Sequence, residues 1–117
     1  MPDSDESTLN FKNRFPFDVV IQHMRFHHPG CPKKSCLTIA ARVSARDWKG
    51  LKLGAAVGIE LQKHIRHSYT DYDELLRSKM MTSEEARAFI TPQVQGILRA
   101  WRMPGLKLRL VRRIGDN

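Results

Sequence analysis

The sequence predicts a mostly α protein: a small single-domain bundle of five or six short helices, with a possible C-terminal strand or extended basic arm. Three observations support this class. The chain has 117 residues, which suits one domain with one core. Apolar residues recur at three- and four-residue spacing in several segments, which is the period of an amphipathic helix. Capping residues and proline–glycine pairs separate those segments.

The two ends of the chain differ in composition from its middle. Residues 1–10 carry three acids and no base, so we expect a disordered acidic N-terminus. Residues 11–103 hold the helical patterns and are predicted to form the folded domain. Residues 104–117 are predicted to form a basic C-terminal tail. Apolar and basic residues alternate there from 106 to 111, which is typical of a strand or of an arm that orders on binding.

The first two predicted helices flank a loop. Pro16 suits the first turn of a helix that runs to about His27. The Pro-Gly-Cys-Pro sequence at 29–32 favours a loop, and residues 33–46 then form a second predicted helix. The apolar positions of the first helix are Val19, Val20, Met24 and Phe26, and those of the second are Cys36, Ile39, Ala40 and Val43.

The third predicted helix has the clearest pattern. A break at 47–54 precedes it, in which Trp48 and Leu51 could anchor the chain to the core. Residues 55–67 then place apolar side chains at i, i+4 and i+8, and Tyr69 could extend the stripe. The stripe comprises Val57, Leu61 and Ile65.

Capping signals locate the remaining helices. Thr70 can cap the next helix, with Asp73 as its capping-box partner three residues later. Thr82 and Glu85 repeat this signal ahead of a helix from about Ser83 to Ile90. Thr91-Pro92 then predicts the cap and first position of a separate last helix, which Pro104-Gly105 ends. The apolar face of that last helix comprises Val94, Ile97, Leu98 and Trp101.

Basic charge is the feature most informative about function. The net charge is +8, and the excess of basic residues lies in residues 11–66 and 99–117. Such clusters favour a polyanionic partner, because cations near phosphates release condensed counterions. We therefore expect a binding module that contacts the phosphates of DNA or RNA without strong sequence specificity. The predicted contact residues are Lys33, Lys34, Arg42, Arg46, Lys49, Lys52, Arg99, Arg102, Lys107, Arg109, Arg112 and Arg113.

Alternative partners and geometries stay open. A protein–protein interaction module for an acidic partner would explain the same charge. The helices at 33–46 and 55–67 could form a helix-turn-helix, but the break between them exceeds the usual turn of about three or four residues. The polar, acidic N-terminus lacks the pattern of a secretory signal and no apolar run has the length of a membrane span, so we expect a cytosolic protein without membrane contact.

The stretch HIRHSYTDYDELL, residues 64–76, is the densest in polar and aromatic groups. We interpret it mainly as a junction that holds two helices at a fixed angle. A metal-dependent enzyme centred on His64, His67 and Asp73 is the alternative, because Glu60 and the two histidines share one helix face. The residues of this cluster are His64, His67, Tyr69, Thr70, Tyr72 and Asp73.

A second set of metal-ligand residues lies between 23 and 36. His23, His27, Cys31 and Cys36 could bind zinc, although the spacing of the cysteines is looser than in zinc motifs. The alternative is a pair of free thiols, with Cys36 as a small hydrophobic residue. No phosphate loop, dinucleotide fingerprint or serine-nucleophile motif occurs, so we expect no catalytic residues and no cofactor.

Five short motifs resemble a known family. They are Pro-Gly-Cys-Pro at 29–32, His-Ile-Arg-His at 64–67, Thr-Asp-Tyr-Asp-Glu-Leu-Leu at 70–76, Glu-Ala-Arg at 85–87 and Leu-Arg-Ala-Trp at 98–101. With them, the chain from about Pro29 to Trp101 resembles the family called domain of unknown function twenty-two ninety-three. The resemblance implies a small helical cytosolic domain and supplies no activity, cofactor or partner. It also implies that Arg87 joins the cluster of His67, Thr70, Tyr72 and Asp73, with Asp73 as its candidate ion-pair partner.

Overall fold

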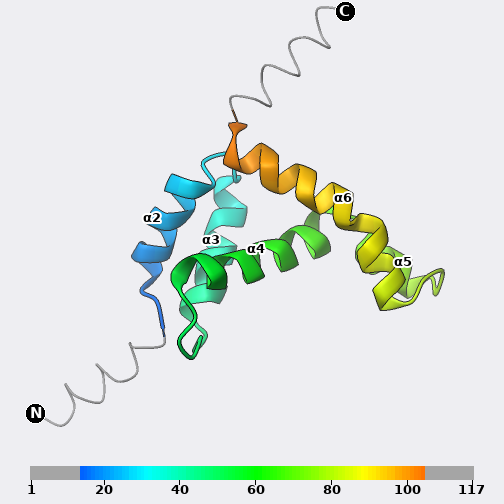
Figure 1. Ribbon diagram of the computed structural model, residues 1–117, viewed down its shortest axis with the longest axis horizontal. Helices are drawn as coiled ribbons and strands as arrows, with labels where there is room; N and C mark the ends of the chain where they lie inside the picture. The colour runs from blue at the N-terminus through cyan, green and yellow to red at the C-terminus, as the bar shows by residue number, and fades with distance from the viewer. Residues whose placement is uncertain (1–13, 105–117) are drawn as a thin grey trace, which may run out of the picture. The chain divides into compact units, whose positions relative to one another are not determined.

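A computed structural model describes residues 14–104, and Figure 1 shows its five helices. They are α2 (Phe17–His27), α3 (Lys33–Ser44), α4 (Leu53–Tyr69), α5 (Tyr72–Arg77) and α6 (Ser83–Arg102). No strand occurs among the described residues, so the mostly α class is confirmed. The predicted acidic N-terminus at 1–10 and the alternating segment at 106–111 lie outside these residues, and the domain limits of 11–103 stay a prediction.

The described chain divides into two compact units. Unit 1 contains residues 14–27 and 31–61, and unit 2 contains residues 28–30 and 62–104. Helix α4 therefore contributes its first half to unit 1 and its second half to unit 2. None of the described helices combines the length and the apolar composition that a bilayer crossing requires.

Helices α2 and α3 pack together in unit 1. The carbonyl of Pro16 accepts the first helical hydrogen bond of α2, from the N–H of Val20. The predicted apolar face of α2 was partly wrong: Val19 is exposed and Phe26 is 80% exposed, whereas Ile21 is buried. The reason is helical geometry, because the buried side chains lie at i, i+1 and i+4 from Val20 and the other two residues fall outside this arc. The predicted apolar face of α3 is confirmed, since Cys36, Ile39, Ala40 and Val43 are all buried.

A turn between α3 and α4 anchors unit 1 through one aromatic residue. Trp48 is buried, and its indole N–H donates a hydrogen bond to the carbonyl of Val43 over 2.8 Å. The expectation that Leu51 also anchors the turn was wrong, because Leu51 is 44% exposed. The chain reverses at Lys49 and Gly50, which both have positive φ angles, 47° and 91°. This tight reversal turns the chain before Leu51, and that side chain faces solvent.

Helix α6 of unit 2 is continuous through a proline. The prediction of two helices that meet at Thr91-Pro92 was wrong. Pro92 lacks an N–H and so removes one ladder bond, to the carbonyl of Ala88, but both residues are exposed and water can reach that carbonyl. The buried stripe of α6 runs across the proline and outweighs the loss. It comprises Ala86, Ile90, Val94 and Trp101.

The start of α6 agrees with its sequence signal. Thr82 and Glu85 form the predicted capping box: the Thr82 hydroxyl accepts from the N–H of Glu85, and the Glu85 carboxylate accepts from the N–H of Thr82. Near the other end, the segment His28–Gly30 contacts α6, because the N–H of Gly30 donates to the carbonyl of Trp101 over 2.7 Å. The Pro-Gly-Cys-Pro motif at 29–32 and the Leu-Arg-Ala-Trp motif at 98–101 are thus in direct contact, although they are far apart in the sequence.

Candidate functional site

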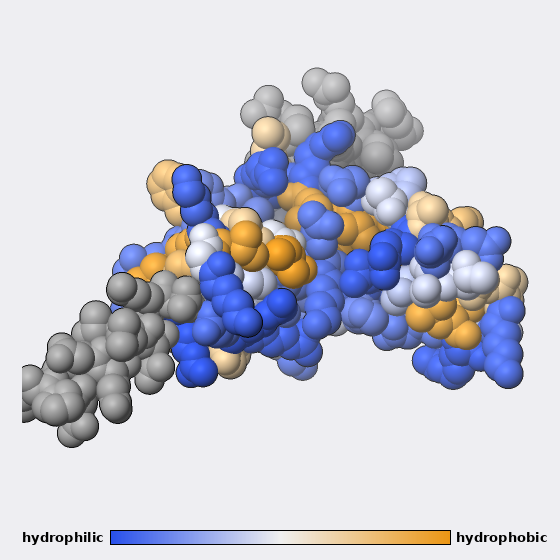
Figure 2. Space-filling view, turned by 60° about the horizontal axis from the view of Figure 1, so that its bottom comes forward, coloured by the Kyte–Doolittle hydropathy of each residue, from blue (hydrophilic) through white to orange (hydrophobic). Residues whose placement is uncertain are grey.

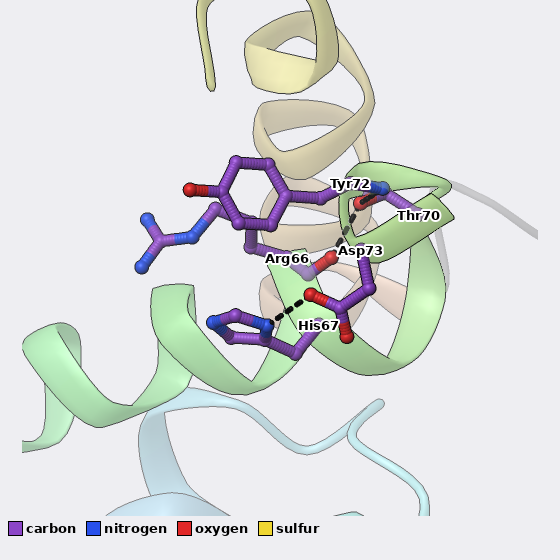
Figure 3. A network of polar contacts seen from close by, with 5 residues as sticks. All are labelled: Arg66, His67, Thr70, Tyr72 and Asp73. Carbon is purple, nitrogen blue, oxygen red and sulfur yellow. Dashed lines mark hydrogen bonds and ion pairs between the residues drawn. The ribbon is translucent and has the colours of Figure 1, made fainter. Parts of the chain in front are cut away.

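The turn between α4 and α5 gathers several polar side chains of unit 2 (Figure 3). Nδ1 of His67 lies 2.7 Å from Oδ1 of Asp73. The Thr70 hydroxyl donates to the carbonyl of Arg66 and accepts from the N–H of Tyr72 over 3.2 Å. These contacts fix the end of α4 and the first turn of α5 to each other.

The predicted capping box of Thr70 and Asp73 was wrong. The carboxylate of Asp73 contacts the His67 ring, and the residue at the N-cap position of α5 is Asp71, whose side chain makes no capping bond. The capping-box pattern assigns the carboxylate of Asp73 to the backbone N–H of Thr70. In the structure His67, near the end of α4, binds that carboxylate instead. Thr70 instead makes a side-chain turn with its own backbone two residues on, as threonine hydroxyls often do.

The ring of Tyr72 contacts the side chains of His67 and Arg66. Tyr72 is 5% exposed, and the His67 ring meets it edge-on at a centroid distance of 5.3 Å. The guanidinium carbon of Arg66 lies 5.3 Å from the centre of the Tyr72 ring, and Figure 3 shows the two side by side. Stacking on an aromatic ring holds a guanidinium in one orientation. The Thr70–Asp73 turn thus positions Arg66, through Tyr72.

Arg87 lies on α6. Asp73 pairs with His67, and no ion pair joins Arg87 to Asp73 in the described chain, so the pairing that the resemblance implied was wrong. Arg87 instead lines a small pocket that Arg66 also lines. Neither Arg66 nor this pocket was among the predicted site residues. The available signal was the spacing of Gln62 and Arg66, which are neighbours at i and i+4 on α4.

The other two residues of the predicted cluster have aromatic contacts. The rings of His64 and Tyr69 have centroids 5.9 Å apart, and Tyr69 meets the indole of Trp101 edge-on at 5.2 Å. Tyr69 is 41% exposed, so it continues the apolar stripe of α4 only in part. With residues of α6 it lines a mainly apolar, open groove of about 400 Å³.

Metal-ligating residues do not converge in the described chain. Between residues 14 and 104 no three side chains of histidine, cysteine, aspartate or glutamate could hold a metal ion together. Glu60 is 3% exposed, and its carboxylate accepts a hydrogen bond from the guanidinium of Arg46, with which it forms an ion pair. Burial, with a smaller contribution from neighbouring Cys36, raises the pKa of Cys31 to about 12. Burial raises the pKa of Cys36 as well, so both thiols are protonated at neutral pH.

Unit 1 carries exposed basic residues on α3 and on the turn that follows it. Residues 33–52 include six basic residues and one acid, Asp47. The carboxylate of Asp47 accepts a hydrogen bond from the backbone N–H of Lys49. We call Lys33, Lys34, Arg42, Lys49 and Lys52 the α3 basic surface, and all five are exposed.

Arg46 has a structural role that its sequence position did not reveal. Its guanidinium is 3.3 Å from the carboxylate of Glu60 and 4.1 Å from the centre of the Trp48 ring. It neutralises a buried acid and covers the anchoring tryptophan, so it differs from the five residues of the α3 basic surface, which form no ion pair in the described chain.

The second predicted basic cluster is only partly described. Arg99 and Arg102 are exposed in the last turn of α6, where cations interact favourably with the helix dipole. The other four residues lie outside the described chain: Lys107, Arg109, Arg112 and Arg113.

These features define the class of the protein, a small all-α protein with a strongly basic sequence and a polar turn that links two of its helices. A family model described as "Uncharacterized conserved protein (DUF2293)" matches residues 23–102, and the chain belongs to this family. The match contains all five of the motifs that carried the resemblance. Searches of curated proteins and of solved structures found no match.

Proposed function

We propose that this protein binds nucleic acid through its phosphates, without strong sequence specificity, and that the α3 basic surface makes the main contacts within the described chain. The observation that supports the proposal is that all five cations are exposed and that none of them forms an ion pair with another residue of the described chain. An unpaired exposed cation can neutralise a phosphate without breaking an existing ion pair, and the released counterions supply the free energy of binding. The cytosol stays the predicted compartment.

The α3 basic surface suits contacts with the phosphates of a nucleic acid better than recognition of its bases. Lys33 and Lys34 open α3, where the unbonded N–H groups of a first helical turn also favour anions. Lys49 and Lys52 lie on the turn and not on a helix that could enter a groove. Lysine acts as a point charge on a flexible stem, which favours phosphate over the directional edges of bases.

An exposed aromatic residue in the same unit favours single strands. Phe26 near the end of α2 is 80% exposed, and Arg25 and His27 flank it. Bases of single-stranded nucleic acid stack on aromatic side chains in a manner that tolerates sequence. We therefore expect single strands to bind at least as tightly as duplexes of the same length.

The test is a fluorescence titration with random-sequence single strands and duplexes at two salt concentrations. We expect binding at low salt that weakens steeply at the higher concentration. The double variant Lys33→Gln/Lys34→Gln should bind more weakly, whereas the control Lys63→Gln, which removes an exposed lysine of unit 2, should bind as the wild type does. Absence of binding at low salt, or binding that is indifferent to salt, would refute the proposal.

A further inference from the structure

Helices α4 and α6 line a small polar pocket in unit 2. Its volume is about 120 Å³, which admits several water molecules. The polar lining consists of Gln62 and Arg66 on α4 and of Arg87, Thr91 and Gln95 on α6. The spacing i, i+4 on α4 and i, i+4, i+8 on α6 places each set along one helix face. The apolar part of the lining is Ile90 and Val94, both buried.

The charged residues that line this pocket are both positive. Two guanidinium groups line it, and none of the acidic residues between 14 and 104 does. Neither Arg66 nor Arg87 forms an ion pair within residues 14–104. The Nε atom of Arg66 is buried and donates no hydrogen bond to another atom of the described residues. A buried donor without an acceptor is costly, which marks the surroundings of Arg66 as polar but incompletely satisfied. Two like charges at one pocket repel each other, and an anion bound between them would relieve that repulsion.

The geometry points to a phosphate-binding site: we propose that this pocket binds the phosphate group of a phosphate monoester or of free inorganic phosphate. Arginine forks match the oxygens of a tetrahedral oxyanion through paired N–H donors. The Thr91 hydroxyl is engaged with the carbonyl of Arg87 over 2.7 Å, so the amides of Gln62 and Gln95 supply the remaining side-chain donors. The volume of about 120 Å³ suits a phosphate group better than a base with its sugar.

The polar turn of α4 and α5 acquires a role in this site. Tyr72 holds the guanidinium of Arg66, and the contacts of Thr70 and of His67 with Asp73 hold Tyr72. A guanidinium fixed before binding loses less conformational entropy when the anion arrives. Arg66 is therefore one of the binding residues, and Tyr72 is a positioning residue.

The experiment is a titration with inorganic phosphate, followed by NMR of the side-chain amides of Gln62 and Gln95 in the full chain. Sodium chloride at matched ionic strength is the control for general salt effects. We expect saturable shifts of both amide signals with phosphate and none with chloride. Signals that move linearly up to about 10 mM phosphate, ten times a dissociation constant of about 1 mM, would overturn the proposal.

Variants identify the binding residues. Arg66→Met and Arg87→Met, which keep much of the apolar stem, should each weaken phosphate binding by about tenfold or more, whereas the control Arg77→Met should leave it unchanged. Gln95→Glu changes an exposed residue, so it should leave the fold intact, and the added negative charge should abolish binding. Unchanged phosphate binding in a folded Gln95→Glu protein would contradict the assignment.

A second arm distinguishes the source of the phosphate. A short single strand is titrated with and without a 5′-terminal phosphate. Tighter binding of the phosphorylated strand that is lost in Arg87→Met assigns the pocket to nucleic-acid ends, and equal binding of the two strands with saturable inorganic phosphate assigns it to small phosphates. The pocket and the α3 basic surface have no residue in common, so failure of this test leaves the proposed function standing.

Discussion

The N–H of Gly30 donates a 2.7 Å hydrogen bond to the carbonyl of Trp101, and the two backbones approach so closely that a side chain at position 30 would be crowded. A Cβ atom at position 30 would lie 3.0 Å from the carbonyl oxygen of Ala100 and from Cα and the carbonyl oxygen of Trp101. These are backbone atoms, which cannot rotate away. We expect Gly30→Ala to lower the free energy of unfolding by about 1–3 kcal/mol, measured by chemical denaturation.

Gly58 provides the matched control. It lies inside α4, and a Cβ atom there would meet nothing within 4 Å. Gly58→Ala should stabilise the protein by about 0.5–1 kcal/mol, because alanine loses less backbone entropy in a helix than glycine does. If both substitutions change stability in the same direction, the close contact of Gly30 with Trp101 does not determine the result.

Thr70 is expected to contribute more to stability than Asp73. The Thr70 hydroxyl makes two hydrogen bonds with the backbone at a helix junction, so Thr70→Ala should cost about 1 kcal/mol. The ion pair of His67 and Asp73 is about half exposed, so Asp73→Ala should cost less than about 1 kcal/mol. Thermal denaturation compares the two, with Thr70→Ser as the control that keeps the hydroxyl. A larger loss in Asp73→Ala than in Thr70→Ala would show that the ion pair is the main contact of the turn.

Substitutions of Arg42 and Arg46 should have opposite effects: one should weaken nucleic-acid binding and the other should lower protein stability. Arg46→Met leaves the buried carboxylate of Glu60 without its ion-pair partner, and we expect it to lower the free energy of unfolding by about 1–2 kcal/mol. Arg42→Met removes an exposed cation and should leave stability within about 0.5 kcal/mol while it weakens nucleic-acid binding. Denaturation and titration of both variants check this pair of expectations, and the reverse pattern would contradict the roles assigned to them.

The capping box of α6 should make stability depend on pH in the acid range. Hydrogen bonds from the backbone and side chain of Thr82 hold the pKa of Glu85 below its usual value of 4.5. The folded protein thus binds this proton less readily than the unfolded chain does. The contribution to stability is therefore complete above pH 4.5 and is lost as the pH falls through the folded pKa. An NMR titration of the Glu85 carboxyl should give a pKa below 4.5 in the folded protein, and a pKa at or above 4.5 would mean that the box does not form in solution.

Helix positions were largely predictable because local signals specify them. Periodic apolar residues predicted α3 and the core of α4, and the box of Thr82 and Glu85 marked the start of α6. The continuity of α6 through Pro92 was not predictable from the local pattern, which favours a helix start at Thr91-Pro92. What decided it was the buried stripe on both sides of the proline, which is a property of packing.

The polar contacts were less predictable than the helices. A carboxylate at Asp73 suits a capping box, a bond to Arg87 or a bond to His67 equally well in sequence, and only the folded turn selects His67. In the sequence Arg46 is one of several basic residues between 33 and 52. Only the structure shows that it contacts Glu60 and Trp48. The pocket of Arg66 and Arg87 unites residues about twenty positions apart, which no local spacing indicates.

The central claim is that the α3 basic surface neutralises phosphates, and the salt dependence of binding tests it most directly. The measurement is the slope of the logarithm of the association constant against the logarithm of salt concentration, for the wild type and for Lys33→Gln/Lys34→Gln/Arg42→Gln. Each lost phosphate contact should reduce the magnitude of the slope by about 0.7–0.9, so the triple variant should lose about 2–3 units. An identical slope in the two proteins would show that these three residues do not contact phosphates.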